Sequence, residues 1–258
     1  MKEDIKYIDI GANLFSGQFH NKILEEVERA EEKGVGVIIT GSSFESSVGA
    51  AKVESVYSTV GIHPHDASDC SDEVLEAFEK LLLENESIVA VGECGLDYDR
   101  MYSPKDVQLK WFERQVELAV KHKKPLFLHE RAAADDFYQI LSNQREVCER
   151  AVVHCYTGDR ETAEKYLELG CYIGVTGWVC DKRRNQELVD ALEIIPVEKL
   201  MVETDSPYLI PRGIKGLKNP NRPENIVYVL AEIARIKGVP EEELRIKVLE
   251  NTRNFFGI

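Results

Sequence analysis

The sequence predicts an α/β fold in which a single TIM-type (β/α)8 barrel spans residues 1–258. Eight short apolar runs alternate with helix-like segments along the whole chain, which is the pattern of a closed barrel of parallel strands. The length of 258 residues is typical of that fold, and no change in composition marks a linker between domains. An open, doubly wound sheet shares the same alternation and is the alternative fold.

The apolar runs are short enough to be buried strands of a parallel sheet. They cover residues 7–10, 36–40, 56–60, 88–91, 125–128, 151–153, 172–175 and 200–202. Helical patterns fill the gaps between them. Ser103 and Pro104 suit a helix start, and apolar residues then recur at helical spacing up to Val120. Residues 161–169 predict another helix, which Gly170 would end.

Charge and composition limit the classes of function. The net charge of −14 argues against a protein that coats nucleic acid through a bulk positive field, although an enzyme can still hold one strand end locally. We expect no membrane span and no secretory leader, because no apolar run is long enough and the first residues are polar. Six cysteines without a CxxC pair predict reduced, mostly buried thiols, and hence a cytoplasmic or nuclear location.

Ionisable side chains stand at the ends of four of the predicted strands. They are Glu93, His129, His154 and Asp205, and two further histidines, His63 and His65, follow the third run. Active groups of a barrel lie at the carboxyl ends of its strands, so these side chains are expected to converge. Carboxylates mixed with imidazoles indicate a divalent-metal site. Serine-hydrolase elbows and phosphate-binding P-loops have no match in the sequence.

Basic residues are expected to meet an anionic substrate after the last two strands. One stretch is residues 182–184, and another runs from Arg212 to Arg222 with no acid between Ser206 and Pro223. Barrels often bind phosphate in these loops. Arg131 could also reach a phosphate. The alternatives are a solvated basic surface and, for Arg131, a salt bridge to a neighbouring acid.

Several strings together resemble the TatD family of metal-dependent deoxyribonucleases over nearly the whole chain. They are residues 61–65 (GIHPH), 92–97 (GECGLD), 154–158 (HCYTG) and 203–208 (ETDSPY), with 9–14 (DIGANL) and 177–180 (GWVC). The resemblance implies a (β/α)8 fold, a divalent metal and hydrolysis of phosphodiester bonds. The implied activity is that of a 3′–5′ exonuclease on single-stranded DNA, with RNA as a further substrate.

The resemblance also implies roles for individual residues. Glu93, His129, His154 and Asp205 would be the metal ligands, and Asp205 would hold the attacking water. His63 and His65 would lie beside the scissile phosphate and complete the catalytic set with Asp205. Asn13, Arg131, Arg212 and Arg222 are the expected substrate contacts.

One difference from the family bears on the metal. Many relatives carry two metal-binding histidines at the end of the first strand, where this chain has Gly11 and Asn13. Asp9 and Asn13 could offer oxygen there, and a site rich in oxygen favours Mg²⁺ or Mn²⁺ over Zn²⁺. We therefore expect one or two ions, Mg²⁺ first, with Mn²⁺ or Zn²⁺ as alternatives.

Two other functions fit the same fold. A metal-dependent ester or amide hydrolase, such as an aminoacyl-ester deacylase, would use the same scaffold, although the basic loops favour a phosphate substrate. A binding protein without activity is disfavoured by the intact set of four ionisable groups. Single-stranded nucleic acid is the expected partner, in its repair or degradation, without a membrane or an obligate protein partner.

Overall fold

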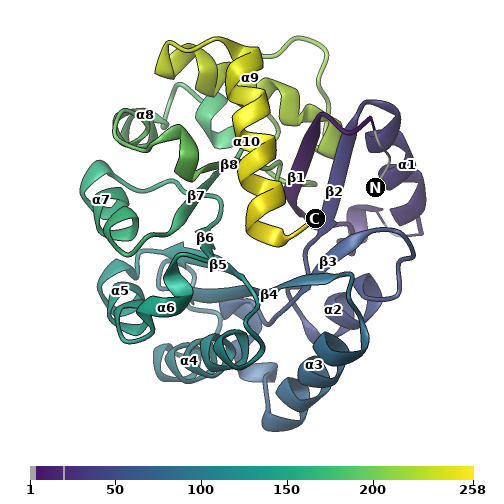
Figure 1. The fold of residues 1–258 in the computed structure, drawn as a ribbon, viewed down its shortest axis with the longest axis vertical. Helices are drawn as coiled ribbons and strands as arrows, with labels where there is room; N and C mark the ends of the chain where they lie inside the picture. Colours follow the sequence, from purple (N-terminus) through teal and green to yellow (C-terminus); the bar gives the residue numbers. More distant parts are fainter. Residues whose placement is uncertain (1–3, 20) are drawn as a thin grey trace. The chain divides into compact units, whose positions relative to one another are not determined.

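The computed structural model describes residues 4–19 and 21–258. Residues 1–3 and 20 lie outside the described part, and with them the first residues on which the expectation about a secretory leader rests. Eight parallel strands follow one another in sequence order through one sheet, with helices between them, which is the order of a (β/α)8 barrel (Figure 1). This confirms the predicted fold class. The doubly wound alternative is wrong, because its strand order would reverse within the sheet.

The strands occupy all eight predicted runs. They are β1 (Tyr7–Ala12), β2 (Val35–Ile39), β3 (Tyr57–Val60), β4 (Ile88–Asp97), β5 (Leu126–Arg131), β6 (Ala151–Val153), β7 (Tyr172–Val175) and β8 (Leu200–Val202). β4 and β5 run further than predicted, so Glu93 and His129 lie inside strands and not after them. Glycine allows this: a Cβ at Gly95, whose φ is +148°, would lie 1.8 Å from the carbonyl oxygen of His129.

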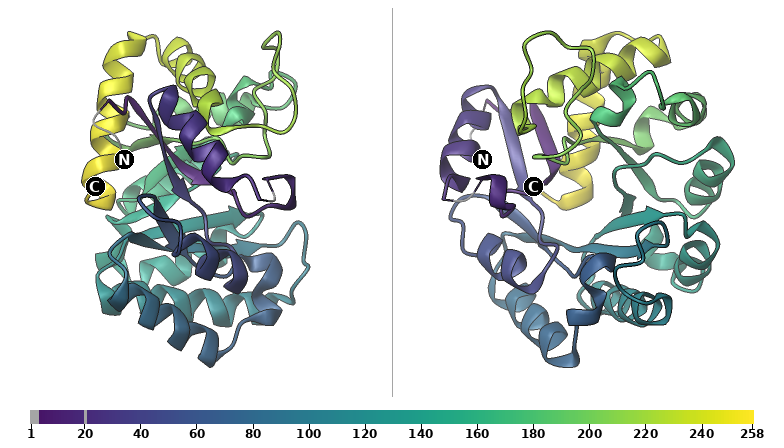
Figure 2. Two further views of the ribbon diagram at one scale, coloured as in Figure 1. Left: turned by 90° about the vertical axis from the view of Figure 1, so that its right-hand side faces the viewer. Right: turned by 180° about the vertical axis from the view of Figure 1, so that it is seen from behind.

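Helices alternate with the strands along the chain (Figures 1 and 2). The described α-helices are α1 (Ile23–Glu32), α2 (Phe44–Ala50), α3 (Asp72–Glu84), α4 (Lys105–His122), α5 (Ala134–Ser142), α6 (Arg145–Cys148), α7 (Arg160–Glu168), α8 (Gln186–Leu192), α9 (Ile226–Lys237) and α10 (Glu241–Phe256). Short 3₁₀ helices are η1 (Gly17–Phe19), η2 (Pro64–Asp69), η3 (Gly177–Cys180), η4 (Val197–Lys199) and η5 (Pro223–Asn225). The helix predicted before Gly170 is α7.

The predicted start of α4 at Ser103 is wrong. Pro104 occupies the cap position, and the helix begins at Lys105. The Ser103 hydroxyl instead donates to the carbonyl of His65 at 2.9 Å and accepts from the amide of Ser68 at 3.0 Å. This buried serine therefore holds the η2 segment in place, and it is not free to cap the helix.

The chain divides into two compact units. One comprises Met1–Ile39, Cys155–Leu167 and Ile173–Ile258, and the other comprises Thr40–His154 and Glu168–Tyr172. The first therefore carries β1, β2 and β8 with the C-terminal helices, and the second carries β3 to β6. Each has a buried apolar core; in the second, Phe112 and Phe137 stack with ring centroids 5.2 Å apart. The single domain over residues 1–258 stays a prediction.

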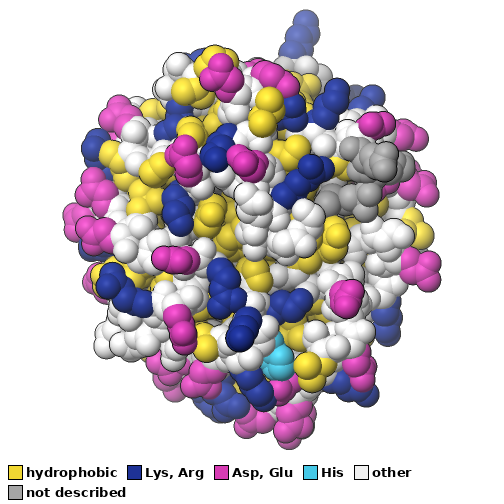
Figure 3. Space-filling model, viewed as in Figure 1, with side chains coloured by type: hydrophobic (Ala, Val, Ile, Leu, Met, Phe, Trp, Pro, Cys, Tyr) yellow, Lys and Arg dark blue, Asp and Glu magenta, His cyan; other side chains and the backbone are white. Residues whose placement is uncertain are grey.

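Charges of both signs are interspersed on the surface. Figure 3 shows acidic and basic side chains mixed over one face of the described residues. Local clusters therefore matter more than the net charge of −14. Within residues 4–19 and 21–258, no helix combines the length and the apolar character needed to cross a membrane. All six cysteines are free and five are buried, which confirms that the thiols are mostly buried.

A buried carboxylate joins β1 to the end of β8 within the first unit. Asp9 is fully buried and accepts from the Thr204 amide at 2.8 Å, from the Thr204 hydroxyl and from the Gly11 amide at 3.2 Å. A parallel bridge between Ala12 and Ser206 continues this contact. Burial raises the pKa of Asp9 to about 7, although the hydrogen bonds from Thr204 oppose that rise.

Asp9→Asn should flatten the dependence of stability on pH. Since the folded pKa of Asp9 lies above its unfolded value, its contribution is fully present below about pH 4 and is lost as the pH rises through 7. Between pH 5 and pH 8 the wild type should lose about 2 to 3 kcal/mol more than the variant, measured by urea unfolding in chelator. Asp190→Asn, at an exposed position of α8, should keep the wild-type slope. Equal slopes in all three proteins would contradict the account.

Candidate active site

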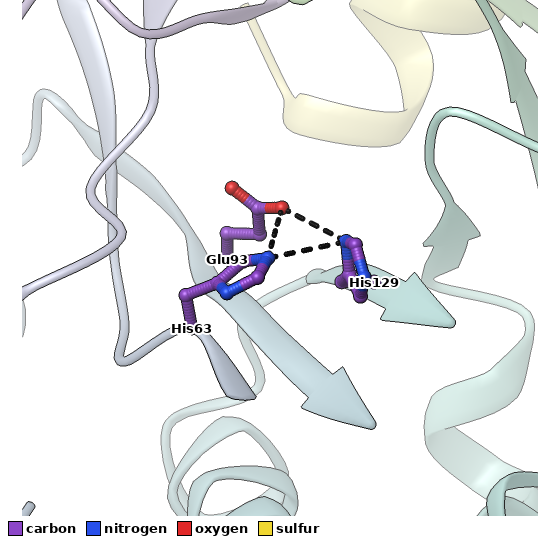
Figure 4. A group of neighbouring side chains, drawn as sticks. All are labelled: His63, Glu93 and His129. Atoms are coloured by element: carbon purple, nitrogen blue, oxygen red, sulfur yellow. Dashed lines mark hydrogen bonds and ion pairs between the residues drawn. The ribbon is translucent and has the colours of Figure 1, made fainter. Parts of the chain in front are cut away.

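Three imidazoles surround one carboxylate oxygen in the second unit. Glu93 projects from β4 and is 5% exposed. Its Oε1 lies 2.8 Å from His154 Nε2, 3.3 Å from His63 Nε2 and 3.3 Å from His129 Nδ1. Figure 4 shows His63 and His129 pointing their ring nitrogens at this oxygen and at each other, 3.2 Å apart. The structure thus brings together four side chains from four successive strands or strand ends, β3 to β6.

The hydrogen bonds of His63 fix where its proton sits. Its Nδ1 accepts from the backbone amide of His65 at 3.1 Å, so a neutral ring carries its hydrogen on Nε2. Burial lowers the pKa of His63 to about 4, although the charge of Glu93 opposes that fall. His63 Nε2 is therefore an N–H donor that faces Glu93 and His129. The candidate ligand atoms of His63, Glu93 and His129 lie within 4.8 Å of one another. In this tautomer, however, Nε2 of His63 carries a hydrogen and has no lone pair to offer a metal.

Asp97 orients His65 and His129. Its Oδ2 lies 2.7 Å from His65 Nε2 and 3.3 Å from His129 Nε2, while Oδ1 accepts from the amides of Asp99 and Arg100 at 3.0 and 2.8 Å. Burial acts to raise the pKa of Asp97, but the hydrogen bonds from the two histidines outweigh it and hold the pKa well below its usual range. A carboxylate behind a metal-binding imidazole commonly sets its tautomer and orientation.

Sequence reasoning missed this role of Asp97. The signal was available, because side chains along a strand alternate between faces and residues 93, 95 and 97 therefore share one face of β4. The sequence could not reveal that His65 and His129 would be its partners.

The donor set of Glu93, His129 and His154 fits a divalent ion. Burial acts to lower the pKa of His129, but hydrogen bonds to Asp97 and Glu93 outweigh that effect and raise it. A ring that keeps its Nε2–H on Asp97 and loses its other proton would turn a lone pair on Nδ1 toward Glu93, so metal binding at this atom would release a proton. The separations of 3.3 and 2.8 Å from Glu93 Oε1 approach the roughly 3.0 to 3.4 Å between neighbouring ligands around an ion with bonds of about 2.1 Å. Burial acts to raise the pKa of Glu93, but its interactions with the surrounding imidazoles outweigh that effect and hold the pKa well below its ordinary value, so the group is ionised, as a ligand must be.

Asp205 belongs to a cluster in the first unit. It lies three residues beyond β8 and has a φ of +54°, a left-handed conformation that aspartate tolerates better than most residues. Asn13 Nδ2 donates to Asp205 Oδ1 at 2.8 Å. The preceding Thr204 is held by Asp9 through its amide and its hydroxyl. Both carboxylate oxygens of Asp9 accept hydrogen bonds from Thr204, so Asp9 positions this residue, and its role as an oxygen ligand stays a prediction.

The predicted basic contacts differ in their surroundings. Arg131 Nε lies 3.0 Å from Asp99 Oδ2, which is the salt bridge weighed as its alternative. Arg222 is paired with the buried carboxylate of Glu26. Arg212 is exposed and lines two hollows of the first unit.

Comparison with known proteins gives a consistent result. Residues 8–257 match the family described as TatD related DNase. A Klebsiella pneumoniae (strain 342) protein named 3'-5' ssDNA/RNA exonuclease TatD is 42% identical, over 97% of each chain. The protein of the same name from Escherichia coli (strain K12) is 39% identical, over 97% of this chain and 98% of its own.

A solved structure gives the same assignment. The crystal structure of YJJV, a TatD homologue from Escherichia coli K12, superimposes with a TM-score of 0.87 and 28% identity, covering 98% of both chains. A family match over nearly the full length, together with relatives at about 40% identity, places this chain in the TatD family of deoxyribonucleases.

Proposed function

We propose that this protein is a divalent-metal-dependent nuclease that hydrolyses phosphodiester bonds, acting as a 3′–5′ exonuclease on single-stranded DNA or RNA. The observation that carries the proposal is the convergence of His129 and His154 on one oxygen of the buried, ionised Glu93. Relatives at about 40% identity bear the name of such an exonuclease, which supports the substrate class.

Glu93, His129 and His154 would hold the metal, and Asp97 would keep the His129 ring turned toward it. When bound, a divalent ion lowers the pKa of water and offsets charge on the phosphoryl group. We propose Mg²⁺ as the physiological ion, as one or two ions, because this chain has Gly11 and Asn13 where many relatives carry two metal-binding histidines, and a site with fewer imidazoles and more oxygen favours a hard cation. Mn²⁺ and Zn²⁺ are the alternatives.

Asp205 would orient the attacking water and accept its proton. Catalytic groups of (β/α)8 barrels stand at the carboxyl ends of the strands, and Asp205 follows β8. Asn13 donates to Asp205 Oδ1, which limits rotation of the carboxylate and so favours a fixed direction of attack.

His63 and His65 would act on the leaving side. The neutral His63 ring presents an Nε2–H, which stabilises charge on the leaving oxygen by a hydrogen bond without giving up a proton. His65 donates its Nε2–H to Asp97 and is 28% exposed at its side chain, so Nδ1 is the atom through which it would exchange a proton with water or product.

The cysteines bear on the cellular compartment, and the proposed activity bears on the partner. Free, mostly buried cysteines fit a reducing environment, so we propose a cytoplasmic location. Single-stranded nucleic acid, met during repair or degradation, would be the partner.

Glu93→Gln should weaken Mn²⁺ binding by about 100-fold or more, beyond the loss of roughly 10- to 100-fold that removal of an outer partner brings. The amide lacks the negative charge that the ion requires. Isothermal titration calorimetry at pH 7.5 measures the affinity. Glu79→Gln is the matched control. Glu79 lies in α3, away from the proposed metal site, and its Oε1 also lies 2.8 Å from an imidazole nitrogen, Nε2 of His122. Equal affinities in both variants would refute the metal site.

Asp97→Asn should lower the affinity for Mn²⁺ by roughly 10- to 100-fold, since His129 would lose the carboxylate that orients it. Circular dichroism and thermal unfolding check that the variant is folded. Asp99→Asn, two residues along the chain, removes a carboxylate that pairs with Arg131 and should leave the affinity unchanged. Wild-type affinity in Asp97→Asn would exclude the positioning role.

Asp205→Asn should reduce kcat on end-labelled single-stranded DNA by roughly 100-fold or more, because the amide cannot accept the proton of water. Chelator should abolish wild-type activity. Asp190→Asn, at an exposed position of α8, is the control that changes the charge by the same amount. Near-normal turnover in Asp205→Asn would show that another group is the base.

A further inference from the structure

A hollow beside the turn that carries Asp205 is not used by the chemistry described so far. Its volume is about 340 Å³, and its lining includes Trp178 of η3 together with Tyr208 and Arg212 from the segment after β8. That segment runs as a long loop to η5, yellow-green in the right-hand view of Figure 2. Tyr208 is 51% exposed and is therefore accessible to a ligand in the hollow.

The hollow is directly tied to Asp205. The amide of Tyr208 donates to the carbonyl of Asp205 at 2.9 Å, so the two residues form one turn. The amide of Asn221 donates to the carbonyl of Pro207 at 3.0 Å and closes the base of the loop. Whatever occupies the hollow therefore lies next to the proposed base.

The walls of the hollow are rigid. A Cβ at Gly177 would lie 2.0 Å from the carbonyl oxygen of Leu209, so only glycine lets η3 pack this closely on the loop. The guanidinium of Arg184 stacks 3.7 Å from the Trp178 ring centroid, and the indole N–H donates to the Arg184 carbonyl at 3.3 Å. The indole is held in one orientation before any ligand arrives.

A second hollow of about 680 Å³ shares Asp181 and Arg212 with the first and is also lined by Lys182. The buried carboxylate of Asp181 is neutralised by Arg183 at 2.6 Å and Arg184 at 3.1 Å. Lys182 and Arg212, in contrast, make no salt bridge with any residue that the structure describes. Arg212 at the boundary between the hollows and Lys182 in the larger one are therefore cations that no salt bridge among the described residues holds, although Glu232 lies near Lys182.

We propose that the smaller hollow holds one nucleobase of the single strand, stacked on Tyr208 against the Trp178 wall, and that Arg212 and Lys182 bind the adjoining backbone phosphate. The inference rests on the proposed nuclease function and adds a nucleotide subsite to it. Stacking on an aromatic ring tolerates any base, because every base has a π face. Paired bases in a duplex are not free to enter such a hollow, which would explain a preference for single strands.

The test uses the two tryptophans of the chain as reporters. Trp111 is buried in α4, so Trp111→Phe leaves Trp178 as the only tryptophan. Titration of that variant with oligothymidylate should quench its fluorescence, whereas Trp178→Phe, which retains only Trp111, should show no quenching. A purely structural role for Trp178 would give no quenching in either variant and would overturn the proposal.

Kinetics give a second, independent readout. Tyr208→Ala should raise KM for oligothymidylate by roughly 5- to 150-fold, and Tyr208→Phe, which keeps the ring, should restore most of the affinity. Arg212→Ala should reduce the slope of log affinity against log salt by about 1. Wild-type hydrolysis with unchanged KM in Tyr208→Ala would overturn the subsite while leaving the nuclease function intact. Absence of wild-type hydrolysis would instead reject the nuclease function itself.

Discussion

The buried charge of Glu93 is the constraint on which the site depends. An ionised carboxylate in a protein interior is costly unless charged or polar partners surround it, and removing its partners costs several kcal/mol. Here three imidazoles supply them through one oxygen. The same arrangement that keeps Glu93 ionised also presents a ready set of ligands for a cation, so stability and metal binding have one origin.

Backbone geometry supports the functional side chains from several strand ends. Non-glycine residues adopt left-handed conformations directly after β5, next to His154 and beyond β8; they are Ala132, Cys155 and Asp205, with φ between +46° and +54°. Such conformations cost energy and persist where surrounding contacts enforce them, most often at functional sites. The Asp9–Thr204 hydrogen bonds and the Asn13 amide are the contacts that hold Asp205.

Much of the fold could be predicted from the sequence, because buried parallel strands are apolar over their whole length. Even β6, which has only three residues, could be recognised as an apolar run. The extent of β4 could not, since Gly92 reads as a break although it lets the strand pass close to Phe127. Pairings between remote residues were also out of reach. Arg222 forms an ion pair with Glu26, 196 residues away in the sequence, and nothing in the local sequence of either residue predicts this contact.

The central claim is that Glu93, His129 and His154 hold the catalytic cation. Anomalous diffraction from crystals soaked in Mn²⁺ tests it most directly, because it locates the ion without reference to activity. The account predicts a peak about 2.2 Å from Glu93 Oε1 and within bonding distance of His129 Nδ1. A peak confined to other residues, or none at saturating Mn²⁺, would contradict it.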